Sequence, residues 1–232
     1  EVGGSAFSLE EKFNYTTANR LREVFTDRFK DNSAKADELI ALKSGRAKAI
    51  ANYVYSDKNG NEGGDDGWNF RGRGIKQLTG RNNYAGFQSF YNANNPNNKK
   101  DFLNNEEHRK ELITNGRVAL LSAVWFWNDK KYPNGSKTNF PIYNGKYLYE
   151  IADMHNDNEV SNSIIHNDRI FTNYYLDSFV ISFLVNGGYN GLLERQLAFY
   201  RIRFGKQYSN LLEAKNDTHK YKNNGIFKDF KI

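Results

Sequence analysis

The sequence contains no cysteine among its 232 residues. This absence excludes disulfide bonds, thiolate metal sites and catalysis by a cysteine nucleophile. Long apolar runs are missing as well. The run from Phe179 to Val185 covers only seven residues, whereas a helix that spans a membrane needs about 20. We therefore expect no membrane insertion.

Acidic residues are too few to balance the basic ones, and the chain carries a net charge of +6 with a pI of about 9.2. Such a charge favours anionic partners, namely nucleic acid, anionic lipid or the peptidoglycan–teichoic acid wall, unless it serves solubility alone. The Lys and Arg residues are scattered among acidic ones, and the sequence has no nucleic-acid-binding motif. DNA and RNA are therefore not expected as partners.

Aromatic residues make up 15% of a chain whose hydrophobic content is only 38%. The core must therefore depend on Phe, Tyr and Trp. A chain of this length can form one sizeable domain or two lobes of one domain. We find no internal repeat.

Helical periodicity dominates the pattern and predicts a mainly α fold with few and short strands. Thr16 or Thr17 is expected to cap a helix whose apolar face carries Leu21, Val24, Phe25 and Phe29. A second helical stretch is predicted over 36–55, followed by a loop over 57–67.

A short helix is predicted over 84–91. Another helix is predicted over 118–127, and because apolar residues lie on nearly all of its faces, it is expected to be buried. Two more helices, over 174–185 and 192–204, are expected to be joined by a turn. Residues 129–170 show no clean period and are interpreted as a possible insertion. Residues 206–232 are predicted to be a polar tail.

The segment from Gly67 to Tyr84 packs glycines, arginines, aromatics and amides into eighteen residues. Gln77, Thr79 and Asn83 can form hydrogen bonds without titrating. Trp68, Phe70 and Tyr84 offer flat apolar faces beside them. This mixture suits an uncharged ligand rich in hydroxyl and amide groups, such as an N-acetylated sugar. The alternative is a glycine-rich structural turn that leads into a short helix.

The same segment resembles the signature of family 19 glycoside hydrolases, the chitinase and phage-endolysin group. Three other segments match that family's motifs in the right order. They are Glu1–Gly4, like the end of a His-Glu-x-Gly-Gly motif; Ser122–Trp127, like its Ala-x-Trp-Phe-Trp helix; and Val185–Gly191, like its Asn-Gly-Gly-x-Asn-Gly turn. One departure is Lys76, where the family usually has an apolar residue.

The resemblance implies a mainly α, two-lobed lysozyme-like fold with little β structure and long loops. It implies a single catalytic domain over 1–232 that hydrolyses β-1,4 bonds of N-acetylhexosamine polymers, as a monomer and without a cofactor. The family's motif places a His before Glu1, so we expect a helix upstream of Glu1 in the whole protein, together with any export signal. Action outside the cytoplasm is expected.

A glycosidase needs one carboxylic acid to protonate the leaving oxygen and a second carboxylate to activate water or attack carbon. By resemblance, Glu1 is the acid. The second carboxylate lies before an Asn-Tyr pair in the family, and counting back from Asn14 selects Glu11. Counting forward from Glu1 selects Glu10 instead. The family inverts the anomeric centre, so the second carboxylate acts as a base on water.

Other roles follow from the resemblance. Thr79 matches the residue that helps to hold the water, and Arg201 matches an arginine that can keep the base ionised. Arg71 and Arg73 could do the same, or form structural salt bridges. The predicted substrate-binding residues are Trp68, Gln77, Asn83, Tyr84, Asn186 and Arg201.

No metal site is expected. The four histidines lack the i, i+4 pairing or carboxylate spacing that suits a metal ion, and the group of Asp153, His155 and Asp157 is interpreted as a chance cluster. The polysaccharide substrate is predicted to be peptidoglycan rather than chitin, because cysteine is absent and the charge is basic. The alternative outside enzymes is a cell-wall carbohydrate-binding relative that has lost catalysis.

Overall fold

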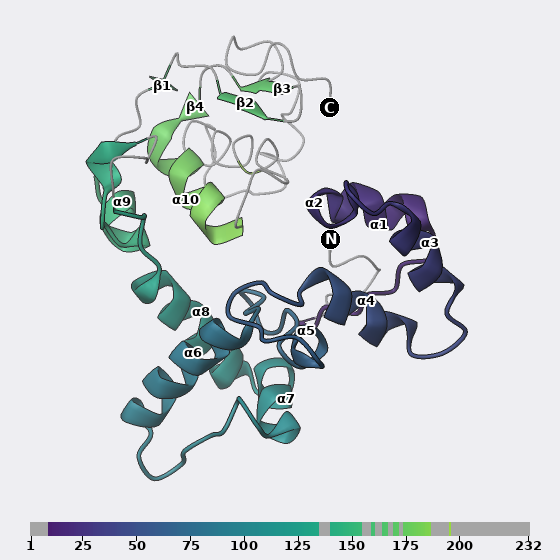
Figure 1. The fold of residues 1–232 in the computed structure, drawn as a ribbon. Coiled ribbons are helices and arrows are strands. Elements are labelled where there is room, and N and C mark those ends of the chain that lie inside the picture. Colours follow the sequence, from purple (N-terminus) through teal and green to yellow (C-terminus); the bar gives the residue numbers. More distant parts are fainter. Residues whose placement is uncertain are drawn as a thin grey trace, which may run out of the picture. The chain divides into compact units, whose positions relative to one another are not determined.

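The computed structural model of the chain divides into two units, Glu1–Phe126 and Trp127–Ile232, which are described separately (Figure 1). The structure describes residues 9–134, 140–154, 159–160, 164–166, 169–171, 174–186 and 195. Helices dominate these residues in both units. The predicted mainly α fold with little β structure is thereby confirmed, and the architecture agrees with a lysozyme-like fold.

Four short helices open the first unit: α1 (Ala18–Val24), α2 (Thr26–Phe29), α3 (Ala34–Ala41) and α4 (Arg46–Val54). The predicted N-cap is confirmed, since the Thr17 hydroxyl accepts a hydrogen bond from the Arg20 N–H at 3.3 Å. The prediction of one helical stretch over 36–55 is wrong. Leu42 is extended and Gly45 has a φ of +66°, so the chain turns between α3 and α4.

The core of this part is aromatic and aliphatic, as the composition predicts. Phe13, Phe29 and Tyr53 pack with residues such as Leu21 and Ile50, both of which are 0% exposed. The rings of Phe29 and Tyr53 lie 5.3 Å apart. Helix α4 thus packs against the segment around Phe13, which directly follows the Glu10–Glu11 pair in the chain.

The rest of the first unit contains α5 (Asp66–Asn69), α6 (Arg81–Asn94), α7 (Glu106–Thr114) and α8 (Gly116–Asp129), the last of which runs on into the second unit. Helix α6 is longer than the predicted 84–91, and α7 was not predicted. On α8, Val118, Ala119 and Trp125 are buried, but Leu120, Val124 and Trp127 are exposed, so the prediction of a buried helix holds for one face only. Trp125 packs so closely on Gly86 that a Cβ there would lie 2.5 Å from the indole.

The second unit contains the 3-10 helix η1 (Pro141–Tyr143), α9 (Leu148–Ala152) and α10 (Leu176–Asn186). Strand β1 (Glu159–Val160) pairs antiparallel with β4 (Tyr174–Tyr175), and β2 (Ile164–His166) pairs antiparallel with β3 (Arg169–Phe171). Helix α10 confirms the helix predicted over 174–185, although it begins two residues later because Tyr174–Tyr175 form a strand.

Buried polar contacts connect the helices of the second unit. The Tyr143 hydroxyl donates a hydrogen bond to Asp177 on α10, and both residues are buried. The helix predicted over 192–204 and the tail over 206–232 lie outside the described residues. The insertion over 129–170 stays a prediction. Among the residues that the structure describes, no helix is long and apolar enough to cross a membrane.

Candidate active site

Three short extended segments of the first unit come together at the glycine-rich motif. The Glu11 N–H donates to the Gly72 carbonyl at 2.9 Å, and the Gly74 N–H donates to the Leu9 carbonyl at 2.8 Å. Arg73 and Leu78 exchange both backbone hydrogen bonds, at 3.2 and 2.7 Å. The chain thus folds back at 74–77 and pairs on its other side with 9–11.

This pairing decides where the two neighbouring glutamates point. Successive side chains of an extended segment lie on opposite faces. Glu10 and Glu11 therefore face opposite sides of the small sheet, and each has its own set of partners.

Glu10 joins a network of ion pairs. Its carboxylate binds Arg71 Nη2 at 2.5 Å and Arg73 Nε at 3.0 Å. The Arg73 side chain is completely buried and also contacts Glu106 at 3.0 Å and the Tyr84 hydroxyl at 3.2 Å. A charge buried to this degree needs such partners to be stable. The sequence left two roles open for Arg71 and Arg73, namely keeping the base ionised or forming structural salt bridges. The structure shows that both form structural salt bridges.

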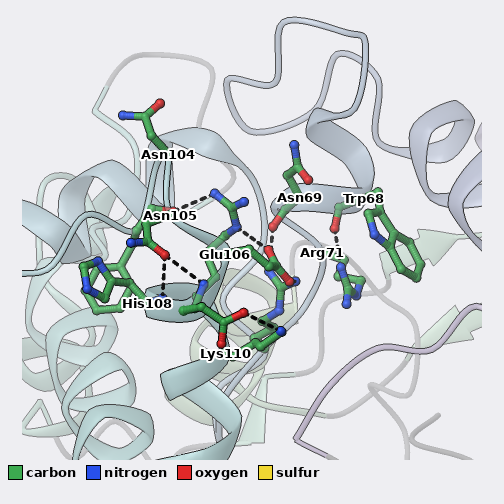
Figure 2. Close-up of polar contacts among 12 residues, drawn as sticks. Trp68, Asn69, Arg71, Asn104, Asn105, Glu106, His108 and Lys110 are labelled. Atoms are coloured by element: carbon green, nitrogen blue, oxygen red, sulfur yellow. Dashed lines mark hydrogen bonds and ion pairs between the residues drawn. The ribbon is translucent and has the colours of Figure 1, made fainter.

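Helix α7 supplies the outer part of this network (Figure 2). The Asn105 side chain caps α7 by accepting from the Glu107 and His108 N–H groups. This cap places Glu106 in the first turn, where its carboxylate bridges Arg73 and Arg109 at 3.0 and 2.7 Å. Helix α7 thus contacts and fixes the Arg73 side chain, although Glu106 follows Arg73 by 33 positions in the sequence.

Figure 2 also shows how Arg71 is fixed next to Trp68. Arg71 Nη1 donates to the Trp68 carbonyl at 2.7 Å, and the guanidinium lies 3.8 Å from the centre of the indole ring. This cation–π contact covers part of the Trp68 ring, which was predicted to bind substrate. Trp68 stays half-buried, with its remaining surface on the wall of a neighbouring hollow.

Glu11 lies in a different environment, without a direct ion pair in the described structure. The Tyr55 hydroxyl donates to its carboxylate at 3.0 Å, and the Gly72 N–H donates to Oε2 at 3.2 Å. Burial raises the pKa of Glu11 above its ordinary value, although both hydrogen bonds and the charge of Arg71 act to lower it. Burial, together with the adjacent Glu11 carboxylate, also raises the pKa of Tyr55. We conclude that Tyr55 stays protonated as a hydrogen-bond donor.

Three of the predicted site residues converge over Gly72. A Cβ atom at this glycine would lie 2.8 Å from Gln77 Oε1, 3.3 Å from Glu11 Oε2 and 3.4 Å from Thr79 Oγ1. The glycine thus allows two uncharged oxygens to approach a carboxylate. A small polar molecule bound at this point could contact all three groups.

Hydrogen bonds hold the two uncharged side chains in place. Gln77 Nε2 donates to the Leu9 and Gly74 carbonyls at 3.1 and 3.0 Å, which leaves Oε1 on the side of Gly72. Thr79 Oγ1 donates to the Gln77 carbonyl at 2.8 Å, so its lone pairs can accept a further hydrogen bond. Asn83 Nδ2 donates to the Thr79 carbonyl at 2.7 Å and supports this arrangement from α6.

Tyr84 does not offer a surface for a sugar. Its side chain is 0% exposed, and its hydroxyl donates to the Arg71 carbonyl at 2.8 Å. The ring lies against Phe70, with ring centres 5.2 Å apart. The predicted substrate-binding role is therefore corrected to a supporting one, because a fully buried ring cannot touch a ligand.

Several predicted residues cannot be placed at this site. Glu1 and Arg201 lie outside the described residues, and Asn186 is the last residue of α10 in the second unit. Their roles stay predictions. The structure adds Tyr55, which the sequence analysis missed because no motif marks it; the hydrogen bond to Glu11 joins residues 44 positions apart.

No metal centre is evident among the described residues, which hold no group of three His, Asp or Glu side chains suited to a cation. His108 is occupied structurally, since its Nδ1 accepts from the Asp101 N–H at 2.9 Å. His155 and Asp157 lie outside the described residues.

A hollow of about 430 Å³ lies in the first unit. The segment after Glu11, the turn between α3 and α4, the first turn of α4 and the indole of Trp68 form its walls. The lining residues are Phe13, Asn14, Leu42, Lys43, Ser44, Gly45, Arg46, Ala47, Lys48 and Trp68.

Comparison with known proteins agrees with the motifs. A Haemophilus influenzae protein described as a glycosyl hydrolase family 19 domain-containing protein is 26% identical over 195 residues, which cover 83% of this chain and 68% of the relative. No family model matches the sequence. The match to the Haemophilus influenzae protein confirms the predicted resemblance to family 19 glycoside hydrolases. The match also supports the classification of this chain as a glycoside hydrolase of the chitinase and lysozyme-like type.

Proposed function

We propose that this chain is an inverting glycoside hydrolase that cleaves β-1,4 bonds of N-acetylhexosamine polymers, with peptidoglycan as its substrate. The observation that carries the proposal is the convergence of Glu11 Oε2, Gln77 Oε1 and Thr79 Oγ1 over Gly72. A carboxylate and two uncharged oxygens at one point are the groups that can activate and orient a water molecule.

In the proposed reaction, water attacks the anomeric carbon and gives its proton to Glu11. The bond from that carbon to the leaving oxygen breaks, and the leaving oxygen takes a proton from Glu1. Inverting enzymes keep their two carboxyl groups roughly 6.5–9.5 Å apart to leave room for the water. We expect Glu1 to lie at such a distance from Glu11 in the active protein.

The raised pKa of Glu11 suits this role. A general base works best when its pKa lies near the pH at which the enzyme operates, because it then accepts a proton readily and is still largely ionised. Tyr55 and Gly72 donate hydrogen bonds that keep the carboxylate oriented. Glu10 is the weaker candidate, since its Oε1 is already ion-paired with both Arg71 and Arg73.

Peptidoglycan is preferred over chitin because the chain carries a net charge of +6, and peptidoglycan bears carboxylates. The proposal includes action outside the cytoplasm, as a monomer and without a cofactor. The second candidate is a chitinase with the same catalytic groups. A non-catalytic relative is disfavoured, since binding alone would not require a desolvated carboxylate beside Thr79.

The test compares two polymers with one protein. The full-length protein should clear a suspension of purified bacterial cell walls and release glycan fragments with intact stem peptides. In proton NMR spectra, early products should carry the α-anomer at the new reducing end, because inversion of a β-linkage gives it. A β-anomer would overturn the inverting mechanism. Activity on chitin oligosaccharides alone would reverse the choice of substrate, and no activity on either would overturn the enzyme assignment.

A further inference from the structure

The hollow beside the candidate active site is basic. Three cationic side chains line it, namely Lys43, Arg46 and Lys48, and no Asp or Glu is among the described residues of its lining. The neutral part of the lining includes Trp68, Asn14 and Ser44, which can pack on a sugar or form hydrogen bonds with it. The hollow is therefore suited to a ligand that carries both a sugar-like body and a negative charge.

Two of the three cations form no ion pair with a described residue. Lys48 is paired with Asp65 at 2.7 Å. Lys43 is exposed, and neither it nor Arg46 forms an ion pair with any residue that the structure describes. Arg46 is partly held by a long contact of 3.5 Å with the Ile40 carbonyl. Among the described residues, two positive charges without an ion pair thus flank the hollow.

The hollow is linked to Glu11 through direct contacts within the first unit. Phe13, on its wall, packs edge-on against the Tyr55 ring with ring centres 5.7 Å apart. The hydroxyl of the same Tyr55 donates to Glu11. On the other side, Trp68 stacks on Arg71, which precedes Gly72. The hollow and the point over Gly72 are thus connected through two short series of contacts, and our inference places a neighbouring substituent of a polymer bound at that point in the hollow.

We infer that this hollow is a subsite for a carboxylate-bearing substituent of the glycan, bound by Lys43 and Arg46 beside Trp68. The inference rests on the proposed function and names the feature by which the enzyme selects its polymer. Peptidoglycan carries carboxylates on the stem peptides along its strand, whereas chitin has no anionic group. The two cations increase the affinity for the charged polymer and leave the affinity for the neutral polymer unchanged.

Binding should be measured separately from hydrolysis. In a Glu11→Gln background, calorimetry gives the affinity for soluble, uncrosslinked peptidoglycan strands free of teichoic acid and for chitin oligosaccharides of equal length. Adding Lys43→Gln and Arg46→Gln should weaken binding to the peptidoglycan strands about three- to tenfold, as expected for two solvent-accessible charge pairs. Binding to chitin oligosaccharides should not change.

The matched control is Lys30→Gln with Lys99→Gln, which removes the same charge from exposed positions that do not line the hollow. This control should leave both affinities unchanged. Strands whose carboxylates are methyl-esterified should bind the Lys43/Arg46 variant and its parent equally.

Each outcome separates the subsite from the proposed function. Equal weakening by the control pair would mean that overall charge, rather than this hollow, attracts the polymer, and would overturn the inference. So would an unchanged affinity for peptidoglycan, or an effect that appears only with walls that retain phosphate-bearing teichoic acid. In all these cases hydrolysis by the protein with Glu11 intact would still support the proposed function, whereas failure of that hydrolysis would overturn both.

Discussion

At the scale of single residues, two adjacent glutamates show how burial and partners give one side chain a structural role and leave the other free for chemistry. Glu10 binds two arginines, one of them 0% exposed. Among the described residues, Glu11 accepts hydrogen bonds from Tyr55 and Gly72, and its pKa is raised. The same carboxyl group thus serves as a fixed counter-ion in one position and as a candidate base in the next.

Exchange of each glutamate for glutamine should separate these roles. Glu11→Gln should lower the hydrolysis rate by about 10²–10⁴-fold, because an amide cannot accept the proton, while the fold persists. Glu10→Gln should instead lower the free energy of unfolding by about 2 kcal/mol, because Arg71 and Arg73 lose a charged partner. Hydrolysis assays and urea unfolding measure the two effects. A greater loss of activity for Glu10→Gln at full stability would assign the base to Glu10.

Tyr55→Phe should shift the pH dependence of hydrolysis. The Tyr55 hydroxyl stabilises the ionised form of Glu11, so its removal raises the pKa of Glu11 further. The base must be ionised, and the acidic limb of the kcat/KM profile should therefore move to higher pH. Tyr53→Phe is the control, since Tyr53 also loses one hydrogen bond, to the Arg28 carbonyl, but does not touch Glu11. An acidic limb that does not move would exclude Glu11 as the titrating base.

At the scale of elements, the fold-back over 72–79 is what assembles the site. Its position depends on pairing with 9–11 on one side and on the Arg73–Glu106 contact with α7 on the other. Gly74 and Gln77 have φ values of +78° and +57° at the two ends of the turn. The turn is therefore held in one conformation by contacts from outside it.

Gly72→Ala should disturb this assembly with little effect on the rest of the chain. The added methyl group would lie 2.8 Å from Gln77 Oε1 and 3.3 Å from Glu11 Oε2, so both must shift. A displacement of this order can cost about 100-fold in rate. Gly116→Ala is the control, because a Cβ there meets no atom within 4 Å. Full activity of the Gly72→Ala protein in the same wall-lysis assay would show that the three oxygens over Gly72 do not act together.

The elements also show where sequence patterns are sufficient. The cap at Thr17 is found as predicted, and a helix covers 118–127 because both follow from local preferences. The predicted burial of that helix is wrong on one face, since Leu120 is 55% and Val124 is 42% exposed. The break between α3 and α4 was missed although the polar run Lys43–Arg46 separates their apolar residues. Leu42 is extended and Gly45 has a positive φ, so two helices form in place of one. Helix α7 was not predicted, and its Glu106 is one of the contacts that fix Arg73.

At the scale of the whole molecule, the net charge of +6 predicts a salt-dependent affinity for cell walls. Binding of the protein to wall sediments should weaken as ionic strength rises beyond about 0.15 M, where the Debye length falls below roughly 8 Å. Binding to insoluble chitin, which is neutral, is the control and should change little. Equal salt dependence for both polymers would argue against attraction by wall charges.

The sequence by itself determined the helical class, the aromatic core and the set of residues around the glycine-rich motif, because these depend on local preferences and on ordered motifs. Only the tertiary structure decided that Glu10 and Glu11 have different partners, that Tyr84 is buried and that Tyr55 contacts Glu11. The reason is physical. The face that each glutamate takes depends on the register between segments 61 residues apart, and burial depends on packing that no local pattern records.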